Sequence, residues 1–103
     1  MPTFRTKKLV CEWIRSGEKT IELRRGRSID GDTITFLSGR GERMKGRILG
    51  KHEGKLEDVL TPVTYSKIVP TAKSFDEALA FIKRIYPLTE SIFTIYEFQL
   101  DEK

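Results

Sequence analysis

Residues 17–24 read Gly-Glu-Lys-Thr-Ile-Glu-Leu-Arg, and this stretch decides how the chain is interpreted. From Lys19 onward it alternates as a β-strand does, with Ile21 and Leu23 facing one side and Glu22 and Arg24 the other. Glu22 and Arg24 are then roughly 7 Å apart along one face, so their long side chains can meet. We expect the turn before the strand to bring the Lys19 amine toward the same place.

These three groups can form the floor of a mixed-charge pocket. Its cations would bind phosphate or a carbonyl oxygen, and its carboxylate would accept hydrogen bonds from a base or a ribose. From spacing alone, an exposed ion pair along the strand, worth about 0.2–1 kcal/mol, explains the same residues. Both interpretations stay open at this point.

A helix is expected before this strand, over residues 7–16. Leu9, Val10, Trp13 and Ile14 would form its buried face, with Cys11 as a small flanking hydrophobic residue. The residue before the helix, a threonine at position 6, is a plausible N-cap, and the glycine at position 17 supplies a left-handed stop.

The rest of the chain alternates between strand and helix signals. Residues 33–37 and 43–51 predict a hairpin, and residues 91–100 read as a central strand. Ser74 begins a capping box that starts a helix ending at Pro87. A short helical turn at 56–60 and a weak segment at 65–69 lie between them. The pattern predicts one α+β domain over residues 1–103: a small, mostly antiparallel β-barrel of about five strands with two or three helices packed on it.

Composition narrows the class of protein. The 103 residues are 38% hydrophobic and 33% charged, which is typical of a soluble globular domain. No apolar run approaches the roughly 20 residues of a membrane span, and the start of the chain lacks a signal peptide, so the cytoplasm is the expected location and no membrane partner is expected. The chain has no Asn and one Gln, a bias that favours a thermophilic source.

One cysteine, Cys11, and one histidine, His52, cannot build a disulfide framework or a Cys/His metal cluster. Neither a GxxxxGK[ST] phosphate loop nor a GxGxxG turn is present. We therefore expect no metal and no cofactor.

Positive charge is concentrated in the first part of the chain. Residues 1–55 contain 14 Lys and Arg against 7 Asp and Glu, whereas residues 56–103 contain 5 against 8. Arg43, Lys45 and Arg47 alternate along one strand face and form a row of three cations. Such an excess favours a polyanion partner, although a surface rich in ion pairs also explains it.

The sequence of residues 17–24 resembles the GxKxxExR signature of the ASCH domains, a branch of the PUA-like superfamily of small RNA-associated β-barrels. The Asp30-Gly31-Asp32 turn, the helix that ends in Ile-Tyr-Pro at residues 85–87 and the last strand also look like family features. The resemblance covers nearly the whole chain. It implies a PUA-like barrel with a central cleft lined by Lys19, Glu22 and Arg24, and RNA or a modified nucleoside as partner.

One branch of this family removes the acetyl group of acetylcytidine, using a Lys that activates a Thr three residues later and a Glu before the long helix. Lys19 matches the first role, but Glu22 stands where the Thr would be, and residues 70–73 hold no carboxylate. Two of the three roles that this hydroxyl-dependent acyl transfer needs are therefore unfilled in this sequence.

Three hypotheses follow. In the first, the chain is a binding domain that takes RNA or a nucleoside near Lys19, Glu22 and Arg24. In the second it is an enzyme, a hydrolase of a modified pyrimidine nucleoside or an RNA-cleaving protein, in which Lys19 serves as base and Glu22 as acid. In the third its basic face meets an acidic protein. For the first hypothesis, sequence-tolerant phosphate contacts are predicted for Arg25, Arg27, Arg40, Arg43, Lys45 and Arg47.

Overall fold

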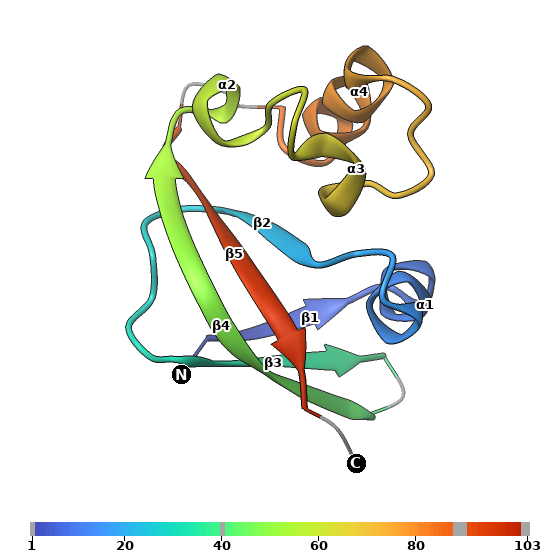
Figure 1. Ribbon diagram of the computed structural model, residues 1–103, viewed down its shortest axis with the longest axis vertical. Helices are drawn as coiled ribbons and strands as arrows, with labels where there is room; N and C mark the ends of the chain where they lie inside the picture. The colour runs from blue at the N-terminus through green and yellow to red at the C-terminus, as the bar shows by residue number, and fades with distance from the viewer. Residues whose placement is uncertain (1, 40, 88–90, 102–103) are drawn as a thin grey trace.

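The computed structural model describes residues 2–39, 41–87 and 91–101. Five strands form one sheet in the order β1-β3-β4-β5-β2, and four helices pack against it (Figure 1). The elements in chain order are β1 (Thr3–Thr6), α1 (Lys8–Ser16), β2 (Ile21–Arg25), β3 (Thr33–Ser38), β4 (Arg43–Gly54), α2 (Leu56–Val59), α3 (Tyr65–Ile68), α4 (Phe75–Ile85) and β5 (Phe93–Leu100).

The sheet is mixed and curls into a half-barrel. β1 pairs with β3 in parallel, and the other three strand pairs are antiparallel. β1 and β2 are the two edges, so the barrel is open between them. The predicted α+β class and barrel are confirmed, as is the central position of β5 between β4 and β2.

The described residues form four helices, whereas the sequence predicts two or three. The weak segment at 65–69 is a one-turn helix, α3, and the turn at 56–60 is another, α2. Figure 1 shows α2, α3 and α4 together at one end of the sheet, while α1 lies apart from them beside β1 and β3. We call α2, α3 and α4 the helical layer.

Helix α1 differs from its prediction at its start and on its buried face. Lys7 occupies the N-cap position without a side-chain cap, because Thr6 belongs to β1 and its hydroxyl lies 2.7 Å from Cys11 Sγ. Leu9 is 53% exposed, whereas Cys11 is only 5% exposed and takes its place in the core. The predicted stop is confirmed, since Gly17 adopts φ 85° and donates its N–H to Ile14 O.

Helix α4 begins at the predicted Ser74 cap, but the return bond of the predicted capping box goes to Lys73, one residue before the N-cap. Ser74 Oγ accepts the N–H of Glu77 at 3.1 Å, and the Glu77 side chain accepts the N–H of Lys73 at 3.2 Å. Asp76 and Glu77 lie in the first turn, where a helix dipole favours acids. Such a cap is worth about 1 kcal/mol.

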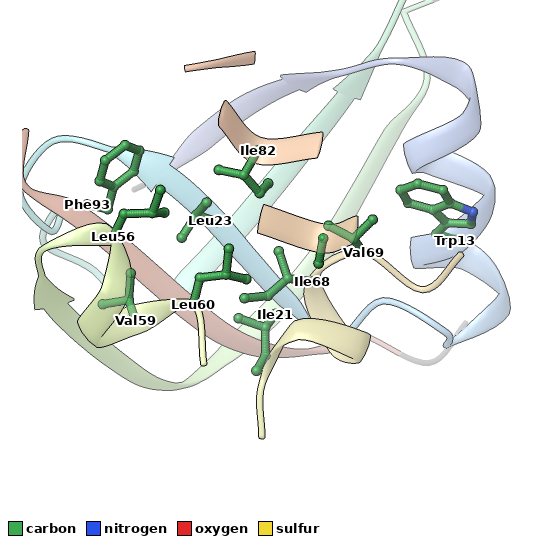
Figure 2. Packing of buried hydrophobic residues seen from close by; sticks show 11 residues of the cluster. Trp13, Ile21, Leu23, Leu56, Val59, Leu60, Ile68, Val69, Ile82 and Phe93 are labelled. Carbon is green, nitrogen blue, oxygen red and sulfur yellow. The ribbon is translucent and has the colours of Figure 1, made fainter. Parts of the chain in front are cut away.

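Two clusters of buried side chains flank the strand that carries the predicted site. The first fills the space between β2, β5 and the helical layer, and Figure 2 shows Ile21 and Leu23 of β2 within it. The second lies inside the barrel and includes Phe4 and Tyr96. Because Glu22 pairs directly with Tyr96, its side chain faces the barrel interior. The predicted alternation of β2 is therefore confirmed, but core lies on both sides of the strand.

Candidate functional site

Local backbone bonds fix the segment that leads into β2. After Gly17 ends α1, the N–H of Lys19 donates to Trp13 O at 3.0 Å, which folds the chain back against the helix. The N–H of Thr20 then donates to Lys67 O at 3.1 Å in α3. These bonds hold Lys19 at the point where α1, α3 and β2 meet.

The Lys19 ammonium is buried and saturated with acceptors. Its Nζ donates to Ile21 O at 2.9 Å and to Ile68 O at 2.7 Å, and it lies 3.4 Å from Glu22 Oε1. An ammonium carries three N–H donors, so these acceptors match its full capacity. Lys19 thus cross-links the start of β2 to the end of α3.

Glu22 joins the two cations of the site. Its Oε1 faces Lys19, and its Oε2 accepts from Arg24 Nη2 at 3.1 Å. The Lys19 and Glu22 side chains are 5% and 6% exposed, and the Arg24 side chain is 28% exposed. The expectation that the three groups converge is confirmed, whereas the alternative of an exposed surface pair is wrong.

Arg24 also spans the open side of the barrel. Its Nη2 donates to Arg5 O at 2.9 Å, which links the two edge strands β2 and β1. The guanidinium carbon lies 4.6 Å from the centre of the Phe4 ring, a cation–π distance. Its Nε is buried without a hydrogen-bond acceptor among the described residues.

Burial controls the electrostatics of this trio. It lowers the pKa of Lys19 because the charged form loses its water; Glu22 opposes this effect, and the Arg24 charge adds to it. The net charge of the three groups, with Lys19 protonated, is +1. An electron-rich ligand group near the trio is therefore favoured over a cation.

A pocket of about 140 Å³ opens above these side chains, between β2, the end of β1, α1 and α4. Its floor includes Lys19, Glu22 and Arg24, and Arg5 and Lys7 lie at the β1–α1 side. The walls are aromatic and aliphatic, formed by Val10, Trp13, Ile68, Phe81, Ile85 and Tyr86. Pockets for drug-sized ligands measure about 300–1,000 Å³, so this one suits a single small ring system.

The cations predicted to contact phosphate lie in different places. Arg43, Lys45 and Arg47 are exposed on β4, as expected, and none of them forms an ion pair with another residue that the structure describes. Arg43 lines a shallow hollow that also includes Arg5 and Lys7. Arg47 lines a separate hollow beside Asp101.

Arg25 and Arg27 are exposed at the far end of β2 and in the loop that follows it, and they line neither of these two hollows. Arg40 lies outside the described residues. Contact of these three with RNA stays a prediction.

Sequence reasoning missed the residues that complete the pocket. Arg5 and Lys7 carried no signal beyond their charge, because a four-residue strand shows little alternation. Phe81 and Tyr86 carried no signal for a site either, and only the fold places them, from α4 and its C-cap, along the pocket.

Within residues 2–39, 41–87 and 91–101, no group of three or more His, Cys, Asp or Glu side chains is placed to hold a metal ion. In the same ranges no helix has the length and apolarity that crossing a bilayer requires.

No protein-family model matches the chain, and no curated protein sequence matches it significantly. Solved structures do share its fold. The hypothetical protein PH0355 is 16% identical with a TM-score of 0.75, and the match covers 96% of this chain and 97% of that one.

Two ASCH structures also match. ASCH from Zymomonas mobilis is 15% identical with a TM-score of 0.68, over 94% of this chain and 65% of that one. The ASCH domain from Lactobacillus crispatus JV V101 is 9% identical with a TM-score of 0.66, over 96% of this chain and 79% of that one. The chain therefore has the fold of the ASCH structures, as the sequence resemblance predicts.

Proposed function

We propose that this protein is an ASCH-type binding domain that takes one base of an RNA, or a modified nucleoside, into the pocket above Lys19, Glu22 and Arg24. The observation that carries the proposal is the convergence of these three charged side chains beneath aromatic walls. The chain shares its fold with ASCH structures, and the resemblance of residues 17–24 to the ASCH signature implies RNA or a nucleoside as the ligand.

The pocket chemistry matches a planar heterocycle. Trp13, Phe81 and Tyr86 offer apolar and aromatic surface for the ring. Each oxygen of Glu22 already accepts from one cation and keeps a second lone pair, which can accept an exocyclic or ring N–H of the base. The Arg24 guanidinium is the partly exposed donor of the trio and can meet a carbonyl oxygen.

Lys19 contributes to binding through its charge and through the position of β2. Its three donors are directed to protein acceptors, so the ligand contacts we assign belong to Glu22 and Arg24. Exposed cations outside the pocket, namely Arg25, Arg27, Arg43, Lys45 and Arg47, would add phosphate contacts that tolerate any sequence, as would Arg40.

One observation favours an enzyme as the second candidate. Burial lowers the pKa of Lys19, which is the property that a lysine base requires, and Glu22 lies beside it. The candidate reactions are hydrolysis of a modified pyrimidine nucleoside and RNA cleavage. Binding remains the first proposal because the Lys19 amine is buried and held by two backbone carbonyls and by Glu22.

The single tryptophan of the chain provides the test. Trp13 lines the pocket, so its fluorescence should change when nucleosides or short single-stranded RNA bind. Glu22→Gln should weaken binding by about tenfold or more, the value of a hydrogen bond to a charged group. Glu97→Gln, an exposed carboxylate on β5, is the matched control and should bind as the parent protein does.

An activity assay distinguishes a binding domain from an enzyme. Acetylated cytidine and a pool of single-stranded RNA are incubated with the protein and with Lys19→Ala. Turnover that this substitution abolishes would establish an enzyme, whereas binding without turnover supports the domain proposed here. If no nucleoside or RNA binds even at low salt, the proposal is wrong.

A further inference from the structure

A single side chain closes the open side of the barrel, which we call the seam between β1 and β2. No strand pairing joins these two edges in the described residues. The N–H of Thr35 donates to Pro2 O at 2.9 Å, and alternate residues of a strand direct their backbone groups to the same side, so Arg5 O points away from β3 into the seam. Arg24 Nη2 donates to this oxygen at 2.9 Å, and the guanidinium carbon lies 4.6 Å from the centre of the Phe4 ring. Both of these contacts across the seam belong to one guanidinium.

The same guanidinium covers the carboxylate of Glu22. Its Nη2, which already donates to β1, also donates to Glu22 Oε2 at 3.1 Å. Lys19 Nζ lies 3.4 Å from the other oxygen. Although Glu22 lines the pocket, its side chain is only 6% exposed, whereas the Arg24 side chain is 28% exposed. One movement of Nη2 would therefore break the contact across the seam and uncover Oε2 together.

This position of Arg24 leaves one of its donors unsatisfied. The Nε is buried and has no hydrogen-bond acceptor among the described residues. A buried donor without an acceptor lacks the hydrogen bonds that it makes in water, and this loss offsets part of what the other contacts contribute. Turned outward, the guanidinium would have water at all five of its N–H donors. An arginine side chain has many rotamers, so an outward position that competes with the observed one needs no change in the backbone.

We propose that Arg24 is a gate with two positions. In the closed position, which the structure shows, it joins β2 to β1 and covers Glu22. In the open position the guanidinium has left Arg5 O and the Phe4 ring and extends toward solvent, so that Glu22 Oε2 faces the pocket. The gate is a property of the ligand-free protein and goes beyond the proposed function, because it makes access to the carboxylate depend on one side chain.

Hydrogen exchange at Arg24 Nε reports the opening, because this N–H is buried while the gate is closed. The exchange rate is measured by NMR on ligand-free protein that contains isotopically labelled arginine, and Arg24→Lys identifies the signal by its loss. Urea is then added in steps that stay below the unfolding transition. We expect a rate that does not depend on urea, since the turning of one side chain exposes little surface. A rate that rises with urea in parallel with global unfolding overturns the gate.

The Phe4 ring offers a way to loosen the gate. Phe4→Leu removes the cation–π contact, which corresponds to about twofold to thirtyfold in the equilibrium between the closed and open positions, and the exchange at Arg24 Nε should accelerate by that factor. Phe98→Leu makes the same change in the same buried cluster, but the Phe98 ring contacts Phe36. This control should leave the exchange unchanged. Equal acceleration in both variants would show that loosened packing, and no gate, releases the N–H.

Exposure of the Glu22 carboxylate is measured on the same variants. A water-soluble carbodiimide with an added amine converts accessible carboxylates to amides, and peptide mass spectrometry gives the rate for each residue. Arg24→Ala should accelerate the reaction of Glu22 about tenfold or more, the value of a hydrogen bond to a charged group, and leave that of the exposed Glu97 unchanged. Phe4→Leu should accelerate it by the same factor as the Nε exchange. A constant Glu22 rate in a variant with faster Nε exchange overturns the proposal.

The gate and the proposed function can fail separately. Local opening of Arg24 in a protein that binds no nucleoside or RNA supports the gate and overturns only the proposed function. Ligand binding by a protein in which Arg24 opens only on global unfolding does the reverse. Thermal unfolding verifies that each variant folds, and Phe4→Leu alone decides the test if Arg24→Ala does not fold.

Discussion

Lys19→Met tests whether the buried ammonium is a structural cross-link as well as part of the site. The substitution keeps an unbranched side chain of similar length but removes the charge and all three donors. Ile21 O and Ile68 O would lose their partner at 2.9 and 2.7 Å, and Glu22 would keep only Arg24. The free energy of unfolding should therefore fall.

Opposing effects set the magnitude. A buried acceptor left without a partner costs about 1–3 kcal/mol, and removal of one member of a buried ion pair costs about 3–5 kcal/mol. The variant regains part of this, because no ammonium must then be taken out of water. We expect a net loss of about 3 kcal/mol, equivalent to about 12–24 °C in Tm for a domain of this size.

Urea unfolding followed by far-UV circular dichroism provides the measurement. The double variant Lys19→Met with Glu22→Gln should lose less than the two single variants together, with a coupling of about 0.5–3 kcal/mol. Glu97→Gln again serves as an exposed control. A loss below about 0.5 kcal/mol in Lys19→Met would refute the reasoning, because such a value is typical of a surface substitution.

Further predictions concern pH, packing and caps. Because the pKa of Lys19 is lowered in the folded state, the unfolded chain binds more protons than the folded chain in the alkaline range. The free energy of unfolding of the parent protein should therefore rise with pH relative to that of Lys19→Met, and a difference between the two that narrows with rising pH would contradict this. Gly46→Ala should destabilise by about 1–3 kcal/mol, because its Cβ would lie 2.7 Å from a backbone oxygen of β5, whereas Gly50→Ala, with open space around it, should cost far less in the same urea titration. Tyr96→Phe removes the acceptor of a loop N–H at 3.1 Å and should lower stability by about 1 kcal/mol, measured in the same way. Ser74→Ala should cost about 1 kcal/mol by calorimetry, and an unchanged Tm would show that the cap is dispensable.

Local signals predicted the elements that are specified locally. The Ser74 N-cap and the left-handed Gly17 each act within one helical turn, so their effects can be recognised in sequence and are found in the structure. β1 and the one-turn helices α2 and α3 are different, since four residues are too few to show a period. Their formation depends on partners elsewhere in the chain, such as the parallel pairing of β1 with β3.

The contrast between local and distant determinants also explains which features of the site could be predicted from the sequence. Glu22 and Arg24 are two residues apart on one strand, and their meeting follows from strand geometry. The burial of the trio does not, because the acceptor Ile68 O comes from a helix 49 residues later and the walls come from α4. The sequence thus predicted which charged groups meet, but not that core lies on both sides of them.

The central position of β5 has a consequence for synthesis of the chain. Residues 93–100 are translated after every residue that lines the pocket, yet β5 is the only sheet neighbour of the edge strand β2 among the described strands. A nascent polypeptide that stops before β5 contains Lys19, Glu22 and Arg24 but lacks the strand that pairs with β2. The arrangement of these three side chains therefore depends on residues 93–100, and a chain truncated before β5 should not assemble the pocket.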